Sequence, residues 1–230
     1  MAAIPNLSSP FISRGRALRA RWAWRLRSRG RALGKRALDL ALVLPALLLL
    51  APLLLLVALA IRCYDGGPAL FWQRRVGRHG VVFAFPKFRS MRVDAEAVRV
   101  ALLAANQHGA EGVTFKMRND PRITPIGRLI RRSSIDELPQ LWCVLTGSMS
   151  LVGPRPPLVS EVARYTLRER QRLTVTPGLT CIWQVNGRAE VPFPQQMQMD
   201  LDYIQRPSLW VDIKLILQTL PAVLRGRGAY

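Results

Sequence analysis

The feature that most constrains this sequence is an uncharged apolar run from Leu40 to Ile61, composed mainly of Leu, Ala and Val. A run of this length can cross a bilayer as a helix, and it is longer than most helices in soluble cores. Pro45 and Pro52 lie inside it, and each removes a backbone hydrogen bond and can kink a helix. The run therefore predicts a membrane-embedded helix with a break.

Basic residues flank this run on both sides, with Lys35 and Arg36 before it and Arg62, Arg74 and Arg75 after it. Positive charge marks the cytoplasmic side of a membrane segment, and here it marks both flanks. We therefore predict a re-entrant helix that enters and leaves the bilayer on the same side. A spanning helix that tolerates proline, a cleaved signal peptide and an organellar transit peptide are the alternatives.

The chain carries 34 Lys+Arg against 14 Asp+Glu, a formal net charge of +20. This excess predicts an anionic partner: nucleic acid, phosphorylated substrates or acidic lipid headgroups. An apolar content of 50% excludes a disordered basic tail. Residues 1–36 hold ten of the basic residues and no acid, interleaved with Trp22 and Trp24. They predict an amphipathic leader on an anionic membrane surface, with a disordered leader as the alternative for residues 1–15.

Cysteine and histidine usage narrows the chemistry. Three cysteines without metal-ligand spacing argue for a reducing compartment and against a zinc site. Only His79 and His108 are present, which argues against a Ser-His-Asp hydrolase.

The sequence divides into a basic leader at 1–36, the re-entrant helix at 37–61 and one small domain at 62–230, which the family resemblance given below implies to be the cytoplasmic catalytic domain. The pattern predicts a mainly helical α+β fold. The last helix is predicted to face the core, with a membrane-surface helix as the alternative. Strands are expected at 69–72 and 81–85, an extended segment at 178–186, and helices within 121–132 and at 92–106, 134–146, 158–172, 195–205 and 208–224.

The adjacent acids Asp136 and Glu137 stand out because acids are scarce, and they follow Arg128, Arg131 and Arg132. Nearby guanidinium groups would keep the carboxylates ionised and would also bind phosphate. A carboxylate can attack a phosphoryl group if cations or Mg²⁺ neutralise the repulsion. The competing interpretation is a helix-capping box, because residues 134–137 read Ser-x-x-Glu.

Three segments downstream of the apolar run, at 134–141, 150–156 and 184–188, resemble the bacterial sugar transferase family, the monotopic polyprenyl-phosphate phosphoglycosyl transferases. Further matching segments lie at 71–77, 86–91 and 120–124, and the resemblance extends from about Lys35 to Arg225. It implies an enzyme of the bacterial inner membrane, on its cytoplasmic face. The implied reaction transfers a sugar-1-phosphate from a UDP-sugar to polyprenyl (undecaprenyl) phosphate, releases UMP and begins exopolysaccharide or glycoconjugate assembly.

The resemblance also implies roles for individual residues. Asp136 would be the nucleophile that forms a covalent phosphosugar intermediate, and Glu137 would assist through Mg²⁺ or as an acid/base, so that both acids are the metal-site candidates. The other implied residues are the phosphate-binding Lys87, Arg131 and Arg155, the nucleotide-linked Arg188, and Pro52 at the hinge of the membrane helix.

Each of these residues has a plainer interpretation. Arg155 could cap helix carbonyls, Arg188 could be a solvated loop charge, and Lys87 could lie on the exposed face of a strand. Asp39 is expected to be an ion-pair or helix-cap anchor. Surface or lipid contacts are expected for Arg89, Arg92, Arg122 and Arg128.

The chain departs from the family pattern at Ala51, Thr176 and Cys181, where a serine, a basic residue and a glycine are usual. A serine hydroxyl could bond a carbonyl freed at the kink, so the bend here must be held otherwise. From charge alone, the competing function is a membrane-anchored nucleic-acid-binding protein, which would need aromatic stacking positions among its basic residues.

Overall fold

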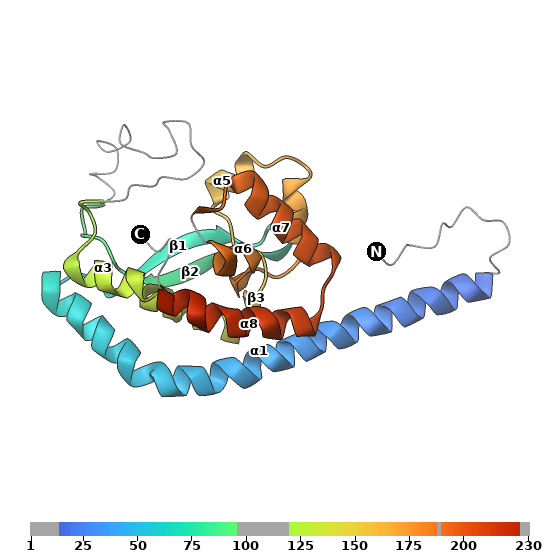
Figure 1. Cartoon of the computed structure of the whole chain (residues 1–230), viewed down its shortest axis with the longest axis horizontal. Coiled ribbons are helices and arrows are strands. Elements are labelled where there is room, and N and C mark those ends of the chain that lie inside the picture. The colour runs from blue at the N-terminus through green and yellow to red at the C-terminus, as the bar shows by residue number, and fades with distance from the viewer. Residues whose placement is uncertain (1–13, 96–119, 188–189, 226–230) are drawn as a thin grey trace.

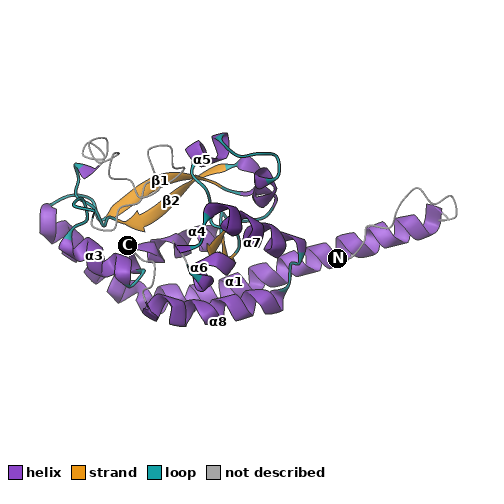
Figure 2. Cartoon of the chain, turned by 45° about the horizontal axis from the view of Figure 1, so that its top comes forward, coloured by secondary structure: helices purple, strands orange, loops and turns teal. Residues whose placement is uncertain are grey.

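A computed structural model describes residues 14–95, 120–187 and 190–225. The described part is mainly helical, with two small two-stranded sheets and one long N-terminal helix. Figure 1 shows this helix, α1, running beneath the other elements, and Figure 2 shows the ribbon of β1 and β2 above α4 (Leu141–Thr146) and α6 (Ile182–Asn186). The predicted leader before residue 14 and most of the predicted helix at 92–106 lie outside the described residues.

Helix α1 (Arg14–Asp65) is continuous through the basic leader and the apolar run. Its part from Gly30 to Asp65 is long and apolar enough to cross a membrane by length and composition. Pro45 and Pro52 lie inside it, and Figure 1 shows the helix changing direction along its length, as proline allows. The predicted divisions at residues 36 and 61 fall within this one helix and stay predictions.

Strands β1 (Leu70–Val76) and β2 (Val82–Phe88) form an antiparallel hairpin in which Leu70 pairs with Phe88 and Val76 with Val82. The turn between them contains the short 3₁₀ helix η1 (Arg78–Gly80), where His79 adopts a positive φ of 57°. Both predicted strands are confirmed, and each continues beyond its predicted end.

The centre of the chain folds as α3 (Pro125–Arg132), η3 (Ile135–Gln140) and α4 (Leu141–Thr146). Helix α3 begins where the Thr124 hydroxyl accepts a hydrogen bond from the Gly127 amide at 2.8 Å. The predicted helix at 134–146 is correct in place and in its end at Gly147, which has a φ of +89°. Its first half is a 3₁₀ helix that contains Pro139.

The predicted single helix at 158–172 is wrong. The structure has α5 (Val159–Ala163), a break, and η4 (Glu169–Thr174). The Glu169 carboxylate accepts from the Thr166 amide at 2.6 Å, which closes a turn between the two pieces. Arg172, the last residue of the predicted helix, lies in η4 and is buried.

Strand β4 (Gly178–Thr180) pairs in parallel with β3 (Ser150–Val152). The prediction of an extended segment from 178 to 186 is correct only as far as the strand. Helix α6 (Ile182–Asn186) follows Cys181, whose carbonyl accepts from the Val185 amide.

Helices α7 (Phe193–Gln205) and α8 (Leu209–Arg225) close the described chain, as predicted. Asp212 and Leu215 of α8 are buried, so one face of this helix packs inward. It is not the apolar face that the sequence pattern predicts to face the core, since none of its residues is buried: Leu209, Trp210, Ile213, Ile216, Leu217 and Leu220. Trp210, Leu217 and Leu220 are exposed, and they lie at spacings that place them along one stripe of the helix.

Two apolar clusters attach α1 to the rest of the molecule. In the first, Val43 of α1 packs with Phe85 of β2 and Val144 of α4. In the second, Ile61 near the end of α1 packs with Phe88 and Ile130. Both clusters include β2, so the hairpin is held between the two ends of the apolar helix.

Candidate active site

The predicted acids Asp136 and Glu137 lie in the first turn of η3. Ser134, just before this turn, has a left-handed φ of 56°, a strained conformation for a residue other than glycine. Its side chain makes no cap hydrogen bond. The capping-box interpretation is therefore wrong for Ser134 and Glu137.

The carboxylate of Glu137 pairs with Arg155, with 2.6 Å between Oε1 and Nη2. Arg155 follows β3 in the Gly-Pro-Arg-Pro loop, 18 residues further along the chain. Burial works against the charge of Arg155, but the pairing with Glu137 outweighs it and raises the pKa of the guanidinium. The loop therefore presents Arg155 to the acids rather than to helix carbonyls.

Lys87 reaches the same site from β2. Its ammonium lies 5.4 Å from the centre of the Phe71 ring. Burial, and then the charge of Arg75, lower the pKa of Lys87 to about 8, while Asp136 and Glu137 act to raise it. Lys87 is thus a half-buried cation beside the acids, and not a freely exposed strand residue.

The pKa of Asp136 depends on the same neighbouring charges. Burial, and then the charge of Glu137, raise its pKa, while Arg131, Lys87 and Arg155 oppose the rise. The structure therefore brings together Asp136, Glu137, Lys87, Arg131 and Arg155, which come from β2, α3, η3 and the Gly-Pro-Arg-Pro loop.

Arg75 of β1 belongs to this site but was not singled out from the sequence. Its Nη1 donates to the carbonyl of Pro156 at 2.9 Å, and its guanidinium lies 5.2 Å from the Phe85 ring centre. Burial, and then the charge of Arg155, lower its pKa to about 10. Its place in the matching segment 71–77 was the available signal.

The site prediction named two further residues. Arg188 lies outside the described residues. Pro52 is an exposed residue of α1, where it can shape the helix but not the chemistry.

The expectation of surface contacts is wrong for Arg89 and Arg122, which are buried. Arg122 pairs with Asp120 at 2.6 Å, ahead of α3. Arg89 pairs with Asp65 at the end of α1. Arg122 neutralises the buried carboxylate of Asp120 within one segment, whereas Arg89 pairs with the exposed residue Asp65 and so joins the end of α1 to the segment after β2.

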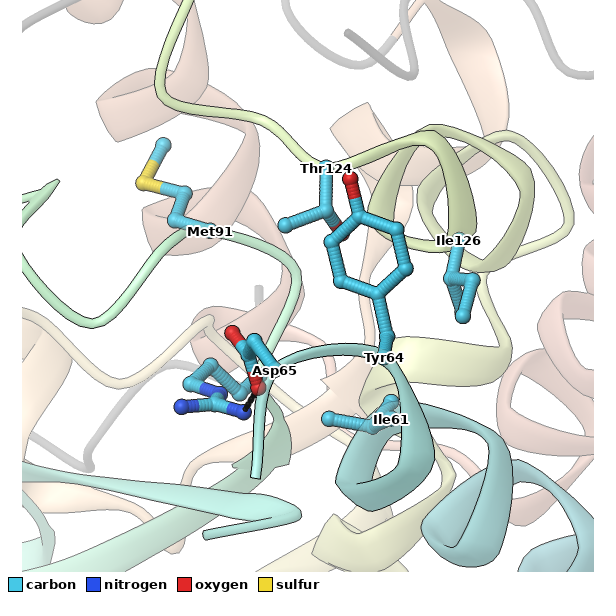
Figure 3. A pocket seen from close by; sticks show the side chains of 7 residues that line it. Ile61, Tyr64, Asp65, Met91, Thr124 and Ile126 are labelled. Atoms are coloured by element: carbon cyan, nitrogen blue, oxygen red, sulfur yellow. Dashed lines mark hydrogen bonds and ion pairs between the residues drawn. The ribbon is translucent and has the colours of Figure 1, made fainter. Parts of the chain in front are cut away.

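A pocket lies beside the Asp65–Arg89 pair, and Figure 3 shows it between the end of α1 and the segment that leads into α3. Ile61, Tyr64 and Ile126 form much of its apolar wall. Neither acid of the dyad lines it, and the arginine in its wall is already neutralised by Asp65. This pocket is therefore separate from the candidate active site.

The dyad offers two carboxylates to a metal ion. Among the described residues, no group of three or more His, Cys, Asp or Glu side chains could hold one. Mg²⁺ commonly binds through one or two carboxylates together with substrate phosphates and water. Asp136 and Glu137 thus fit a magnesium ion that arrives with a phosphorylated substrate, and they do not form an all-protein metal cage.

Paired carboxylates enclosed by several cations define a class of site suited to phosphate esters. Here the site belongs to a chain with a helix that could cross a membrane by its length and composition. The chain belongs to the bacterial sugar transferase family, whose model matches residues 30–226.

Three relatives are informative. The chain is 48% identical over 198 residues to the galactosyl transferase CpsE of Streptococcus agalactiae serotype III, covering 86% of this chain and 43% of the relative. It is 42% identical over 198 residues to the undecaprenyl-phosphate galactose phosphotransferase of Salmonella typhimurium, covering 85% and 41%. It is 38% identical over 200 residues to the exopolysaccharide production protein ExoY of Rhizobium meliloti, covering 86% and 88%.

The chain thus spans about two fifths of the length of the first two relatives, but most of the length of the third. The resemblance seen in the sequence is confirmed by the family match. The alternative of a nucleic-acid-binding protein is not supported by these matches.

Proposed function

We propose that the protein is a phosphoglycosyl transferase that moves a sugar-1-phosphate from a UDP-sugar to undecaprenyl phosphate and releases UMP. The observation that carries this proposal is the Asp136–Glu137 dyad enclosed by Lys87, Arg131 and Arg155 in a chain of this family. The transfer would be the first membrane step of exopolysaccharide or glycoconjugate assembly.

In the first step, a carboxylate oxygen of Asp136 attacks the phosphorus that bears the sugar. A new bond forms between this oxygen and phosphorus, the bond from phosphorus to the bridging oxygen breaks, and UMP leaves with that oxygen. Burial and the charge of Glu137 raise the pKa of Asp136 to about 7, so only part of it is ionised near neutral pH. Arg131, Lys87 and Arg155 oppose this rise and reduce the repulsion of the ionised form from the diphosphate. An ionised carboxylate can attack without giving up a proton.

In the second step, a phosphate oxygen of undecaprenyl phosphate attacks the same phosphorus. The bond between phosphorus and Asp136 breaks, the carboxylate is restored, and the sugar-1-phosphate is joined to the lipid as a diphosphate. The same cations neutralise charge in both steps. The reaction is therefore a ping-pong transfer through one covalent intermediate.

Magnesium, if held by Asp136 and Glu137 together with the diphosphate, would supply further neutralisation of phosphate charge. Glu137 already pairs with Arg155, which orients its carboxylate next to Asp136. This pairing supports an assisting role for Glu137.

The membrane placement rests on how α1 is attached. Near the start of the apolar run, Arg36 donates to the Leu145 carbonyl at 2.7 Å, and at its end Asp65 pairs with Arg89. Between these attachments, Leu48 and Leu49 are 81% and 79% exposed. The charged domain to which α1 is attached cannot pass through a bilayer, so it lies on one side of it. Because both ends of the apolar run are attached to this domain, the attachments support a re-entrant helix on the cytoplasmic face.

The test is intact-protein mass spectrometry of the full chain after incubation with UDP-galactose or UDP-glucose, without lipid phosphate. We expect a mass increase equal to one sugar phosphate, followed by its loss on addition of undecaprenyl phosphate. Asp136→Asn should give neither the adduct nor UMP, whereas Asp202→Asn, an exposed change on α7, should give both. Full turnover by Asp136→Asn would refute the nucleophile assignment.

A further inference from the structure

The Gly-Pro-Arg-Pro loop that carries Arg155 is fixed through its backbone carbonyls. The carbonyl of Pro154 accepts from the Gly178 amide at 2.9 Å, and that of Pro157 accepts from the Val76 amide at 2.9 Å. Between these two, the carbonyls of Arg155 and Pro156 are bonded by side chains. The prolines on both sides of Arg155 have no backbone N–H, so the loop cannot form a regular backbone ladder with a neighbouring strand. Arginine side chains from outside the loop bond the two carbonyls instead.

Arg172 supplies the donor for Arg155 itself. Its Nη2 lies 3.1 Å from the Arg155 carbonyl and 2.5 Å from a carboxylate oxygen of Asp200. Its Nη1 donates to the Tyr165 hydroxyl at 2.8 Å. One guanidinium thus joins the loop, α7 and the segment after α5.

Burial keeps Arg172 away from the substrate. Its side chain is 6% exposed and that of Asp200 is 2% exposed. Asp200 balances the charge of Arg172, which makes the buried pair close to neutral. Any effect of Arg172 on catalysis must therefore pass through the loop it holds.

We propose that Arg172 is a positioning residue, which holds the backbone of Arg155 so that the Arg155 guanidinium faces Glu137 and the reacting diphosphate. This proposal rests on the proposed function, because it assumes that Arg155 contacts a phosphate. The ion pair with Asp200 holds the guanidinium of Arg172 in place. A shift of about 1 Å in a positioning group can cost roughly 100-fold in rate, so a single backbone contact can matter.

The test is a double-mutant cycle on the full chain in lipid nanodiscs, with release of UMP from UDP-galactose or UDP-glucose as the readout. Arg172→Lys keeps the charge opposite Asp200, but a single ammonium cannot also reach Tyr165 and Arg155 in the same fork geometry. We expect it to lower kcat by roughly 10- to 100-fold. In an Arg155→Ala background, the same change should have little further effect, because the group it positions is gone.

Tyr165→Phe is the matched control. It removes a hydrogen bond from the same buried arginine and leaves the bond to Arg155 in place. It should lower the thermal stability, as Arg172→Lys does, while kcat stays within about twofold of the parent. Equal losses of kcat in Tyr165→Phe and Arg172→Lys would mean that general packing, and not positioning, is responsible.

The cycle also separates this proposal from the proposed function. Full activity of Arg155→Ala would contradict the role of Arg155 in the reaction. If Arg155→Ala loses activity but Arg172→Lys is fully active, or if the two losses multiply in the double variant, then only the positioning role is overturned.

Discussion

Lys87 lies between two kinds of neighbour, the carboxylates of Asp136 and Glu137 and the cations Arg75 and Arg131. Its lowered pKa of about 8 means that the free protein loses this charge as the pH rises through 8. A neutral lysine attracts a diphosphate less, so kcat/KM for the UDP-sugar should fall above pH 8. A bound phosphate favours the charged lysine, so kcat should decline only at higher pH.

The substitution Lys87→Arg checks the assignment, because arginine stays charged throughout this range. The alkaline decline in kcat/KM should move to higher pH in this variant. In Lys87→Met, kcat/KM at pH 7 should fall by roughly 10- to 100-fold and the alkaline decline should disappear. An unchanged alkaline limb in Lys87→Met would show that another group titrates.

Gly127 is required by close packing at the start of α3. A Cβ added there would lie 1.9 Å from the backbone carbonyl oxygen of Ser90, which cannot move aside as a flexible side chain can. Gly127→Ala should therefore lower the free energy of unfolding by about 2 kcal/mol or more. Gly30→Ala is the control, because a Cβ there meets nothing within 4 Å and alanine favours the helix. Equal thermal stability of the two variants in detergent would contradict the packing argument.

At the scale of elements, α1 is joined to β3 by one buried carboxylate. Asp39, 4% exposed, accepts from the Ser150 hydroxyl at 3.1 Å and from the Leu151 amide at 3.0 Å. Asp39 is thus an anchor, but not the ion pair or helix cap that was expected, because it lies inside α1 and bonds a hydroxyl and an amide of β3. The helix is therefore tied to a strand that leads directly into the Gly-Pro-Arg-Pro loop.

Asp39→Ala should lower the free energy of unfolding by about 2–3 kcal/mol, because it leaves the Leu151 amide without its partner. Asp39→Asn should cost less, since its amide oxygen still accepts one hydrogen bond. The control is Asp94→Ala, which breaks an exposed ion pair with Arg92 and should change stability by less than 1 kcal/mol. Chemical denaturation of the three variants tests the order, and a harmless Asp39→Ala would refute the anchor.

The elements that the sequence predicted well are those with apolar periodicity or a clear end signal. Helices α7 and α8, and the end of α4 at Gly147, are of this kind. The strands were predicted too short because Arg75 and Lys87 are polar residues that face the site and not solvent. The helix at 158–172 was predicted too long because Arg172 is drawn inward by Asp200, a partner 28 residues away.

In the candidate site, too, some residues could be predicted from the sequence and others could not. The acids and three of their cations were found through ordered motifs. Arg75 and Arg172 were not singled out, because their importance depends on which carbonyls they bond in the folded chain. Pro45 and Pro52 predicted the bend of α1, but the contacts that hold its two ends, made by Arg36 and Asp65, could not be read from the sequence.

At the scale of the whole molecule, a basic residue next to the apolar run attaches α1 to the last described helix, α8. Lys35 pairs with Asp212 of α8 at 2.8 Å, and α8 runs beside α1 in both views of the chain (Figures 1 and 2). The exposed stripe of Trp210, Leu217 and Leu220 is therefore carried on a helix that is fixed to α1. Together they would place the dyad at the membrane surface, where a lipid phosphate is found.

This arrangement predicts that residues before and after the apolar run are reached from the same side of the bilayer. Cys63, just after the run, is exposed, while Cys143 and Cys181 are buried, so Cys63 is a natural labelling site. Gly30→Cys adds a second site before the run, in open space. In inverted and right-side-out vesicles, a membrane-impermeant maleimide should label Cys63 in the parent chain, and the introduced thiol in a Gly30→Cys/Cys63→Ser double variant, from the cytoplasmic face. Labelling of the two positions from opposite faces would establish a spanning helix, and the dyad would then depend on only one end of α1 for its place at the membrane.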